Sequence, residues 1–202
     1  MTDHIVTSFS EELEQLSTNV SKMGGLAEAQ LQSAIDAITR QDMALADRTV
    51  SQDQQLDDLE ILIEENAVEL IALRQPMALD LREAMTAIKI AADLERIGDL
   101  AKNISKRSLV IFQDYETPNR LVQGLSRMGK LALGQLKLVL DAYTNRDVEM
   151  ANKVWLSDEE IDEMYNSVFR ELLTYMMEDP RNITACMHLH FIAKNIERMG
   201  DH

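Results

Sequence analysis

The chain of 202 residues contains a single cysteine, Cys186. One thiol can form no disulfide bond within the chain, and it cannot supply the thiolate cluster of a structural zinc site. Small secreted domains are usually cross-linked by several disulfides, whereas cytosolic proteins keep their cysteines reduced. The scarcity of cysteine therefore favours a cytoplasmic protein that folds around a hydrophobic core.

Aromatic residues, glycine and proline are also scarce: aromatic residues make up 4% of the chain, with seven glycines and three prolines. Leu, Ala, Met, Glu and Asp are abundant instead, a composition typical of long helices rather than sheets. No run approaches 18 uncharged apolar residues, so no segment is predicted to span a membrane. The first nine residues lack the basic and then apolar order of a signal peptide, so membrane contact is expected only through partner proteins.

Basic residues are outnumbered, because 20 Lys and Arg stand against 35 Asp and Glu and give a net charge of −15. A nucleic-acid-binding protein needs an excess of basic side chains to replace the counterions of the phosphates, so we expect no nucleic-acid partner. The negative charge suits a bound cation or a basic partner surface, although solvated helix faces also produce it.

Apolar residues recur at three- and four-residue steps and predict six helices, over about residues 5–40, 43–74, 76–112, 118–145, 148–177 and 180–202. Asp42 and Asp147 are suited to cap the second and fifth helices, and Pro76 to the first turn of the third. Gly24-Gly25 interrupts the first pattern and indicates a weak point or a close helix crossing.

The second half of the sequence repeats the first. Twelve residues between positions 21 and 46 recur 105 positions later, between 126 and 151. Short connections between long helices imply antiparallel neighbours. We therefore predict an all-α fold of two tandem three-helix bundles with six long antiparallel helices, divided into residues 1–115 and 116–202.

Two short segments, Glu95-Arg96-Ile97-Gly98-Asp99 and Glu197-Arg198-Met199-Gly200-Asp201, occupy matching places in the two halves. Each places two carboxylates four residues apart, which stacks them on one face of a helix. Two like charges at this spacing destabilise a helix by roughly 0.2–0.5 kcal/mol. A bound cation would offset the repulsion, and the repetition makes a metal site the hypothesis to weigh.

A second set of carboxylate pairs lies one helix earlier in each half. The two sets together form the candidate metal ligands: Asp53, Asp57, Glu95 and Asp99 in the first half, and Asp158, Asp162, Glu197 and Asp201 in the second. Antiparallel neighbours would bring two pairs together as a patch of four carboxylates. All-oxygen donors suit iron, manganese, magnesium or calcium, with zinc a less suited alternative. Spacing alone leaves open a second interpretation, a solvated acidic stripe paired locally with Arg96 and Arg198.

Signatures of catalysis are few. A di-iron oxidase of the helical-bundle class needs Glu-x-x-His in the bundle interior. Neither His188 nor His190 has a Glu three residues before it, and both are expected at the edge of the core. The sequence has no glycine-rich phosphate loop and no Gly-x-Ser-x-Gly segment. We predict that the protein is not an enzyme, and keep as the alternative a metal-dependent hydrolase or oxidase that uses the paired carboxylates.

The motifs of the chain closely resemble those of the PhoU family. In the first half, the resemblance is carried by Asp93-Leu94-Glu95-Arg96-Ile97-Gly98-Asp99, with Arg74-Gln75-Pro76 before this segment and Asn103-Ile104 after it. In the second half, it is carried by Tyr175-Met176-Met177-Glu178-Asp179-Pro180, which precedes the segment that begins at Glu197. The resemblance covers essentially the whole chain and implies two three-helix bundles with multinuclear metal clusters on the (Glu/Asp)-x-x-x-Asp faces. The ligand pattern carries over directly to Glu95, Asp99, Glu197 and Asp201. Asp53, Asp57, Asp158 and Asp162 match as the facing pairs.

The same resemblance implies a cytoplasmic regulatory adaptor of phosphate uptake, which keeps phosphate-starvation genes off. It would connect the ATPase subunit of a phosphate ABC transporter to the sensor histidine kinase of a two-component system, and we expect a homodimer. Two departures set the second half apart. Asn195 stands where Asp93 stands in the first half, and the sixth helix stops one residue after Asp201, so a further C-terminal segment is expected.

Overall fold

The computed structural model describes residues 2–115 and 119–202, with side chains from residue 9 onward except that of residue 158. Almost every described residue is helical, and no strand occurs among them. The elements are α1 (Thr2–Arg40), α2 (Met43–Gln52), α3 (Gln54–Arg74), α4 (Leu79–Asp114), α5 (Asn119–Asn145), α6 (Val148–Leu156), α7 (Asp158–Glu178), the short 3-10 helix η1 (Pro180–Asn182) and α8 (Ile183–Asp201).

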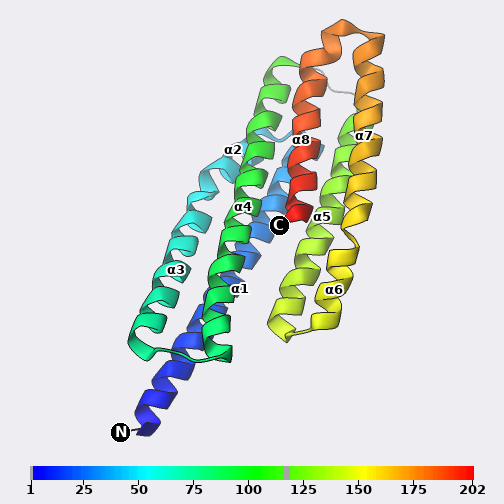
Figure 1. Ribbon diagram of the computed structural model, residues 1–202. Helices are drawn as coiled ribbons and strands as arrows, with labels where there is room; N and C mark the ends of the chain where they lie inside the picture. Colours follow the sequence, from blue (N-terminus) through cyan, green and yellow to red (C-terminus); the bar gives the residue numbers. More distant parts are fainter. Residues whose placement is uncertain (1, 116–118) are drawn as a thin grey trace.

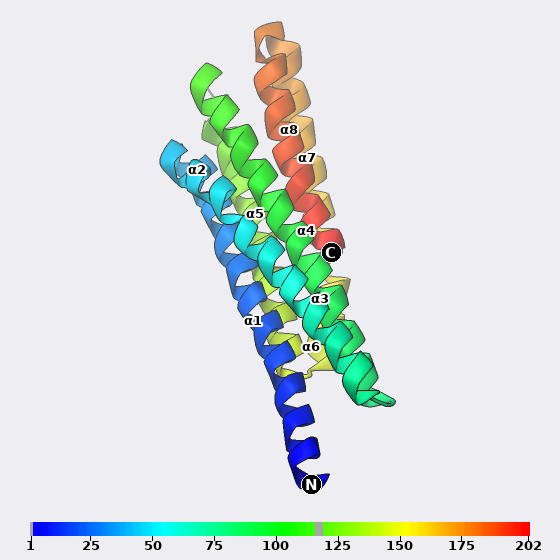
Figure 2. The same ribbon diagram turned by 90° about the vertical axis from the view of Figure 1, so that its left-hand side faces the viewer.

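Two groups of long helices lie side by side (Figure 1). In the first half α3 and α4 pack on each other and on α1, and in the second α7 and α8 pack on each other and on α5. The halves join where α1 meets α5 and where α4 meets α8 (Figure 2). One hydrophobic cluster runs through both halves. The predicted all-α bundle is confirmed, while the predicted boundary adjoins residues 116–118, outside the described part, and stays a prediction.

Two of the six predicted helices are each divided in two, so the prediction of unbroken helices is wrong there. The breaks lie at Asp53, between α2 and α3, and at Ser157, between α6 and α7. Gln30 Nε2 donates to the carbonyl oxygen of Thr49 at 3.4 Å, and Gln135 Nε2 donates to that of Ser157 at 2.9 Å. A side chain that bonds to such a carbonyl interrupts the helical hydrogen-bond ladder. Gln30 and Gln135 match in the repeat, so a glutamine bonds to the backbone near the break in both halves, although the two acceptor residues, Thr49 and Ser157, are not at matching positions.

Asp42 and Asp147 cap α2 and α6, as predicted. The Oδ1 atom of each accepts a hydrogen bond from a backbone N–H in the first turn, at 2.9 and 3.0 Å. The residue before each cap, Gln41 or Arg146, has a φ of 54° and ends the preceding helix. The corner between the first two helices of each half therefore has the same construction in both halves.

The prediction that Pro76 lies in the first turn of the third helix is wrong, because α4 begins at Leu79. Gln75 and Ala78 take positive φ values of 49° and 50° on either side of the connection. Left-handed residues reverse the chain here instead of continuing a helix, so the helical ladder starts later than the proline suggests. Pro118, predicted to open the fourth helix, lies outside the described residues.

Helices α1 and α5 cross closely at two glycines. A Cβ added at Gly24 would lie 2.5 Å from Leu140 Cδ2, and one added at Gly129 would lie 2.6 Å from Ile35 Cδ1. Leu140 and Ile35 also match in the repeat, so each half contributes one glycine and one large aliphatic side chain to a symmetrical crossing. No atom lies within 4 Å of the corresponding position at Gly25, which is exposed. Gly24 therefore makes the close crossing and Gly25 does not.

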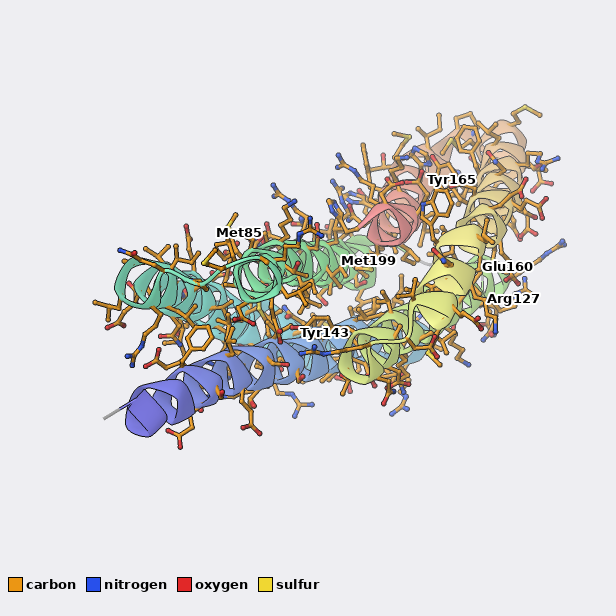
Figure 3. All side chains as sticks on the ribbon, turned by 60° about the horizontal axis from the view of Figure 1, so that its bottom comes forward. Met85, Arg127, Tyr143, Glu160, Tyr165 and Met199 are labelled. Atoms are coloured by element: carbon orange, nitrogen blue, oxygen red, sulfur yellow. The ribbon has the colours of Figure 1, made fainter. Side chains whose placement is uncertain are left out.

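Apolar side chains fill the space between the helices. Figure 3 views the bundle from its lower end and shows Met199 of α8 inside, with Met85 of α4 and Glu160 of α7 on the outside. Met199 is 6% exposed and Met85 is 44% exposed. Among the described residues, no helix offers an apolar stretch long enough to cross a bilayer.

Candidate functional site

Carboxylates from α3 and α4 gather on one side of the first half. We call this set the acidic face: Asp53, Asp57 and Glu60 from the start of α3, and Glu95 and Asp99 from the middle of α4. Burial raises the pKa of Asp57, and the negative charges of Asp53 and Asp99 raise it further. Burial raises the pKa of Glu95, with further contributions from Asp99 and Glu60. Lys102 Nζ donates to both Asp53 and Asp99, so the two predicted pairs of the first half do face each other.

Gly98 allows α3 and α4 to approach at the acidic face. A Cβ at this position would overlap Leu56 Cδ1, and it would lie 3.2 Å from Gln30 Oε1 and 3.6 Å from Asp53 Oδ1. Leu56 is 1% exposed and has little room to move. The glycine between Glu95 and Asp99 is therefore part of how the face is built.

Asp53 differs from the other carboxylates because it is buried, at 4% exposure. Its Oδ1 atom accepts a hydrogen bond from Gln30 Nε2 at 3.0 Å, and its Oδ2 atom accepts one from Lys102 Nζ. Lys102 Nζ also donates to Asp99 Oδ1 at 3.1 Å. The bond to Asp53 is the main cause that raises the pKa of Lys102, so the ammonium stays charged. A cation of the protein itself thus links two of the predicted metal ligands.

The carboxylate oxygens suit a hard metal ion, but the ammonium of Lys102 already lies among them. All the side chains concerned are carboxylates, which favour magnesium, manganese or iron. No group of three or more His, Cys, Asp or Glu side chains in the described part of the chain is arranged as metal ligands. A metal ion held by Asp57, Glu95 and Asp99 would require these side chains to rearrange and Lys102 to leave Asp99.

The second half presents a looser set. Lys194 Nζ lies 2.6 Å from both carboxylate oxygens of Glu197, one turn along the same helix. The bond to Glu197 is the main cause that raises the pKa of Lys194, and the charge of Asp201 adds to it. Asp162 is exposed and forms no hydrogen bond or ion pair with another described residue. Asp158, the remaining predicted ligand, has its side chain outside the described part.

The alternative of local arginine pairs finds little support. Neither Arg96 nor Arg198 forms an ion pair with another residue that the structure describes, although the charge of Arg96 partly opposes the raised pKa of Glu95 and Glu60. Both arginines are exposed. The cation that pairs with the first acidic face is Lys102.

Two residues of this site were not predicted from the sequence. Gln30 and Lys102 reach the buried carboxylate of Asp53. Glu60, which the helical pattern places on the same face as Asp53 and Asp57, joins the acidic face one turn beyond Asp57. The sequence did indicate a special role for Gln30, since a glutamine recurs at the matching position 135 within an apolar pattern. Nothing in the sequence marked Lys102, because a lysine three residues after an aspartate is common on exposed helices.

The acidic face has a pH dependence that can be measured. The pKa of Glu95 is raised in the folded protein, so the folded state binds more protons than the unfolded state between the ordinary Glu value and the raised one. Stability contributed by this group is therefore lost as the pH rises toward neutrality. We expect Glu95→Gln to raise Tm by roughly 1–2 °C at pH 7, the size of one like-charge contact, and to change it little at pH 4. Calorimetry against Glu69→Gln, an exposed position off the face, checks this; equal shifts in both variants would contradict it.

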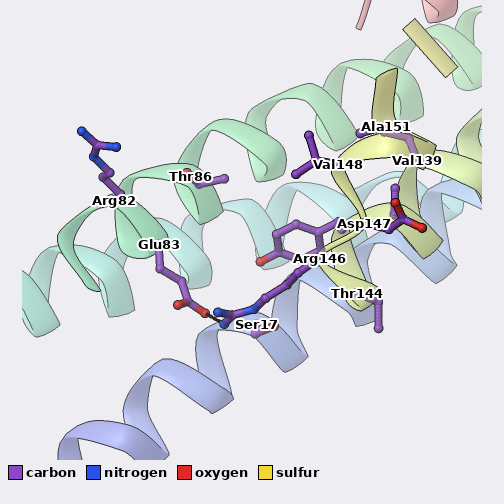
Figure 4. Close-up of a pocket in the computed structure, with 12 residues that line it drawn as sticks. Ser17, Arg82, Glu83, Thr86, Val139, Thr144, Arg146, Asp147, Val148 and Ala151 are labelled. Atoms are coloured by element: carbon purple, nitrogen blue, oxygen red, sulfur yellow. Dashed lines mark hydrogen bonds and ion pairs between the residues drawn. The ribbon is translucent and has the colours of Figure 1, made fainter. Parts of the chain in front are cut away.

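A cavity of about 430 Å³ lies between α1, α4 and the corner that joins α5 to α6 (Figure 4). Arg146 Nη2 donates to Glu83 Oε1 there at 2.8 Å, and burial raises the pKa of Tyr143. Glu83 and Asp99 lie sixteen residues apart on α4, or about 24 Å along the helix. A substrate in this cavity would be out of reach of the acidic face, so the geometry does not favour a hydrolase that uses both.

His188 and His190 lie half-buried at the edge of the core, as predicted. The ring of His190 lies 5.1 Å from that of Phe169 and 6.0 Å from that of Tyr165, and that of His188 lies 6.2 Å from that of Tyr115. Burial lowers the pKa of His190, with a smaller contribution from Lys194. The two histidines pack against aromatic rings rather than extending the acidic set.

Comparison with known proteins identifies similar chains along the whole length. The family described as the PhoU domain matches residues 20–108 and 125–202. A protein of Caulobacter vibrioides named "Phosphate-specific transport system accessory protein PhoU homolog" is 55% identical over 202 residues, which are 100% of this chain and 87% of that relative. The Escherichia coli protein of the corresponding name is 40% identical over 198 residues, or 98% of this chain and 81% of the relative.

A solved structure shows the same arrangement of helices. The crystal structure of PhoU from Pseudomonas aeruginosa superposes with a TM-score of 0.91 at 35% identity, over 96% of this chain and 92% of the other.

Proposed function

This chain belongs to the PhoU family, and on that premise we propose that it is a regulatory accessory protein of phosphate uptake rather than an enzyme. The observation that carries the proposal is the match over the whole chain to relatives named as accessory proteins of phosphate-specific transport. The duplicated helical halves support it, because they supply long exposed helix faces for partner proteins.

The proposed role is that of a negative regulator in the cytoplasm. The protein would contact the ATPase subunit of a phosphate ABC transporter and the sensor histidine kinase of the phosphate two-component system, and would act as a homodimer. A net charge of −15 suits partners with basic surfaces. Its effect would be to hold the kinase in the state that keeps starvation genes off while phosphate is plentiful.

Metal binding is the second part of the proposal. Asp57, Glu95 and Asp99 would hold a magnesium, manganese or iron ion in the first half, and Glu197 and Asp201 the corresponding ion in the second. A bound cation would neutralise like charges on neighbouring helices. The chain's own contribution is to hold these carboxylates on one face, with Gly98 keeping α3 and α4 close.

Affinity purification tests the adaptor role, and elemental analysis tests the metal binding. Full-length tagged protein is expected to retain the transporter ATPase or the kinase, and elemental analysis is expected to find metal without any being added. Glu95→Ala with Asp99→Ala should lose that metal. Glu65→Ala with Glu69→Ala is the matched control, since these exposed glutamates have the same spacing on α3 but lie off the acidic face. Failure to retain either partner at any phosphate concentration would refute the adaptor role.

A further inference from the structure

The ammonium group of Lys102 lies between two of the candidate metal ligands, Asp53 and Asp99. It donates to Asp53 Oδ2 and, at 3.1 Å, to Asp99 Oδ1, so it bridges a carboxylate of the α2–α3 break and one of α4. An ammonium bonded to carboxylates from both places is a positive charge that the two carboxylates share. Lys102 is thus already the counter-ion of one end of the acidic face.

The rest of the acidic face has no such partner. Asp57 and Glu95 form no hydrogen bond or ion pair with any other described side chain, and their negative neighbours outweigh the opposing charges of Lys102 at Asp57 and of Arg96 at Glu95. Asp53 keeps a second bond, from Gln30 Nε2 at 3.0 Å, that does not depend on the lysine. Loss of Lys102 from the face would therefore free Asp99 while leaving Asp53 with one donor.

We propose that Lys102 is an internal counter-cation that competes with metal ions for the first acidic face, so that a metal binds Asp99 only after the lysine has left. This inference rests on the proposed metal binding of that face. The lysine would lower the affinity for divalent cations and keep the face intact when none is bound. The fraction of protein with bound metal would then vary with the free metal concentration.

The chemistry of the lysine side chain fits this exchange. Its flexible four-carbon stem can place the ammonium in several positions. The side chain is 26% exposed and that of Asp99 is 35% exposed, so a path to solvent lies open. An ammonium and a divalent ion that both contact Asp99 Oδ1 would repel each other, so the two compete for that oxygen. Lys194 is not equivalent, because among the described side chains it forms an ion pair only with Glu197 on its own helix, and its contact with α7 is with the ring of Tyr165, 5.4 Å away.

Calorimetric titration of the metal-free full chain with Mn²⁺ tests the competition. Lys102→Met keeps the length of the side chain and removes the ammonium, and should bind Mn²⁺ at least tenfold more tightly than the wild type. Lys89→Met is the control, because this exposed lysine lies on the same helix away from the acidic face. It changes the net charge equally and should leave the affinity within twofold.

The outcomes separate this inference from the proposed function. If wild type and Lys102→Met bind Mn²⁺ equally, the competition is refuted and metal binding stands. If neither binds at millimolar Mn²⁺, the metal part of the proposed function falls and the competition falls with it. A second measurement uses the wild type alone: saturating Mn²⁺ should raise the rate at which Lys102 is modified by an amine-reactive reagent, measured by mass spectrometry. An unchanged rate with bound metal would overturn the proposal even if the variant failed to fold.

Discussion

Gly129→Val is expected to lower the free energy of unfolding by about 3 kcal/mol, at the upper end of the usual cost of overpacking a core. Its Cβ would fall 2.6 Å from both Cδ1 and Cγ1 of Ile35, which is 2% exposed and has no room to turn. The helices α1 and α5 would have to separate where the two halves of the molecule join. Gly24→Val should have a similar effect through Leu140, because the crossing is symmetrical.

Gly25→Ala supplies the control for this prediction. No atom lies within 4 Å of the added methyl group, and alanine stabilises an exposed helix interior by about 0.8–1 kcal/mol relative to glycine. Urea unfolding should therefore move the midpoint upward for Gly25→Ala and downward for Gly24→Val and Gly129→Val. A loss of stability in Gly25→Ala would contradict the open surroundings of that glycine, and an unchanged midpoint in Gly24→Val would contradict the close-crossing interpretation of Gly24.

Asp53→Ala is expected to destabilise the fold by about 3 kcal/mol. The change leaves the side-chain amide of Gln30 buried without its carboxylate partner, and it removes the main bond of the Lys102 ammonium. The loss comes mainly from the Gln30 amide, which stays buried, whereas the Lys102 ammonium keeps its bond to Asp99; a buried donor that loses its partner costs about 1–3 kcal/mol. Thermal and urea unfolding at pH 7 measure the loss.

Asp57→Ala is the matched variant, one helical turn away. Asp57 has a raised pKa caused by burial and by negative neighbours, so its removal relieves repulsion. We expect its stability to stay within about 0.5 kcal/mol of the wild type or to rise slightly. Equal losses in the two variants would contradict the distinction between a buried structural carboxylate and a repelled one. A double-mutant cycle of Asp53→Ala with Lys102→Met would isolate the bond between them.

Periodicity along the chain was enough to predict most of the fold. The six helices and the caps Asp42 and Asp147 depend on residues within a few positions of one another. The duplication at an offset of 105 residues is seen by comparing the two halves of the sequence. Helix formation is a local property, and a sequence displays it directly. The same locality explains why the two acidic pentads could be recognised as carboxylates stacked on one helix face.

The predictions that were wrong have two different causes. Gln30 reaches the backbone carbonyl of Thr49 near the end of α2, just before a break in a helix whose own pattern is continuous. This contact comes from a neighbouring helix, and local periodicity contains no information about that neighbour. Pro76 lies in a connection whose course is set by the positive φ values of Gln75 and Ala78, which helical periodicity does not specify.

The sequence by itself determined that carboxylates would stand in pairs at positions 53 and 57 and at 95 and 99. Only the tertiary structure decided that these carboxylates are not equivalent. Asp53 is buried and bonded twice, Asp99 shares the ammonium of Lys102, and Glu95 faces other negative charges. The physical reason is that spacing fixes the helix face on which a charge stands, while burial and the charges on adjoining helices fix its energy.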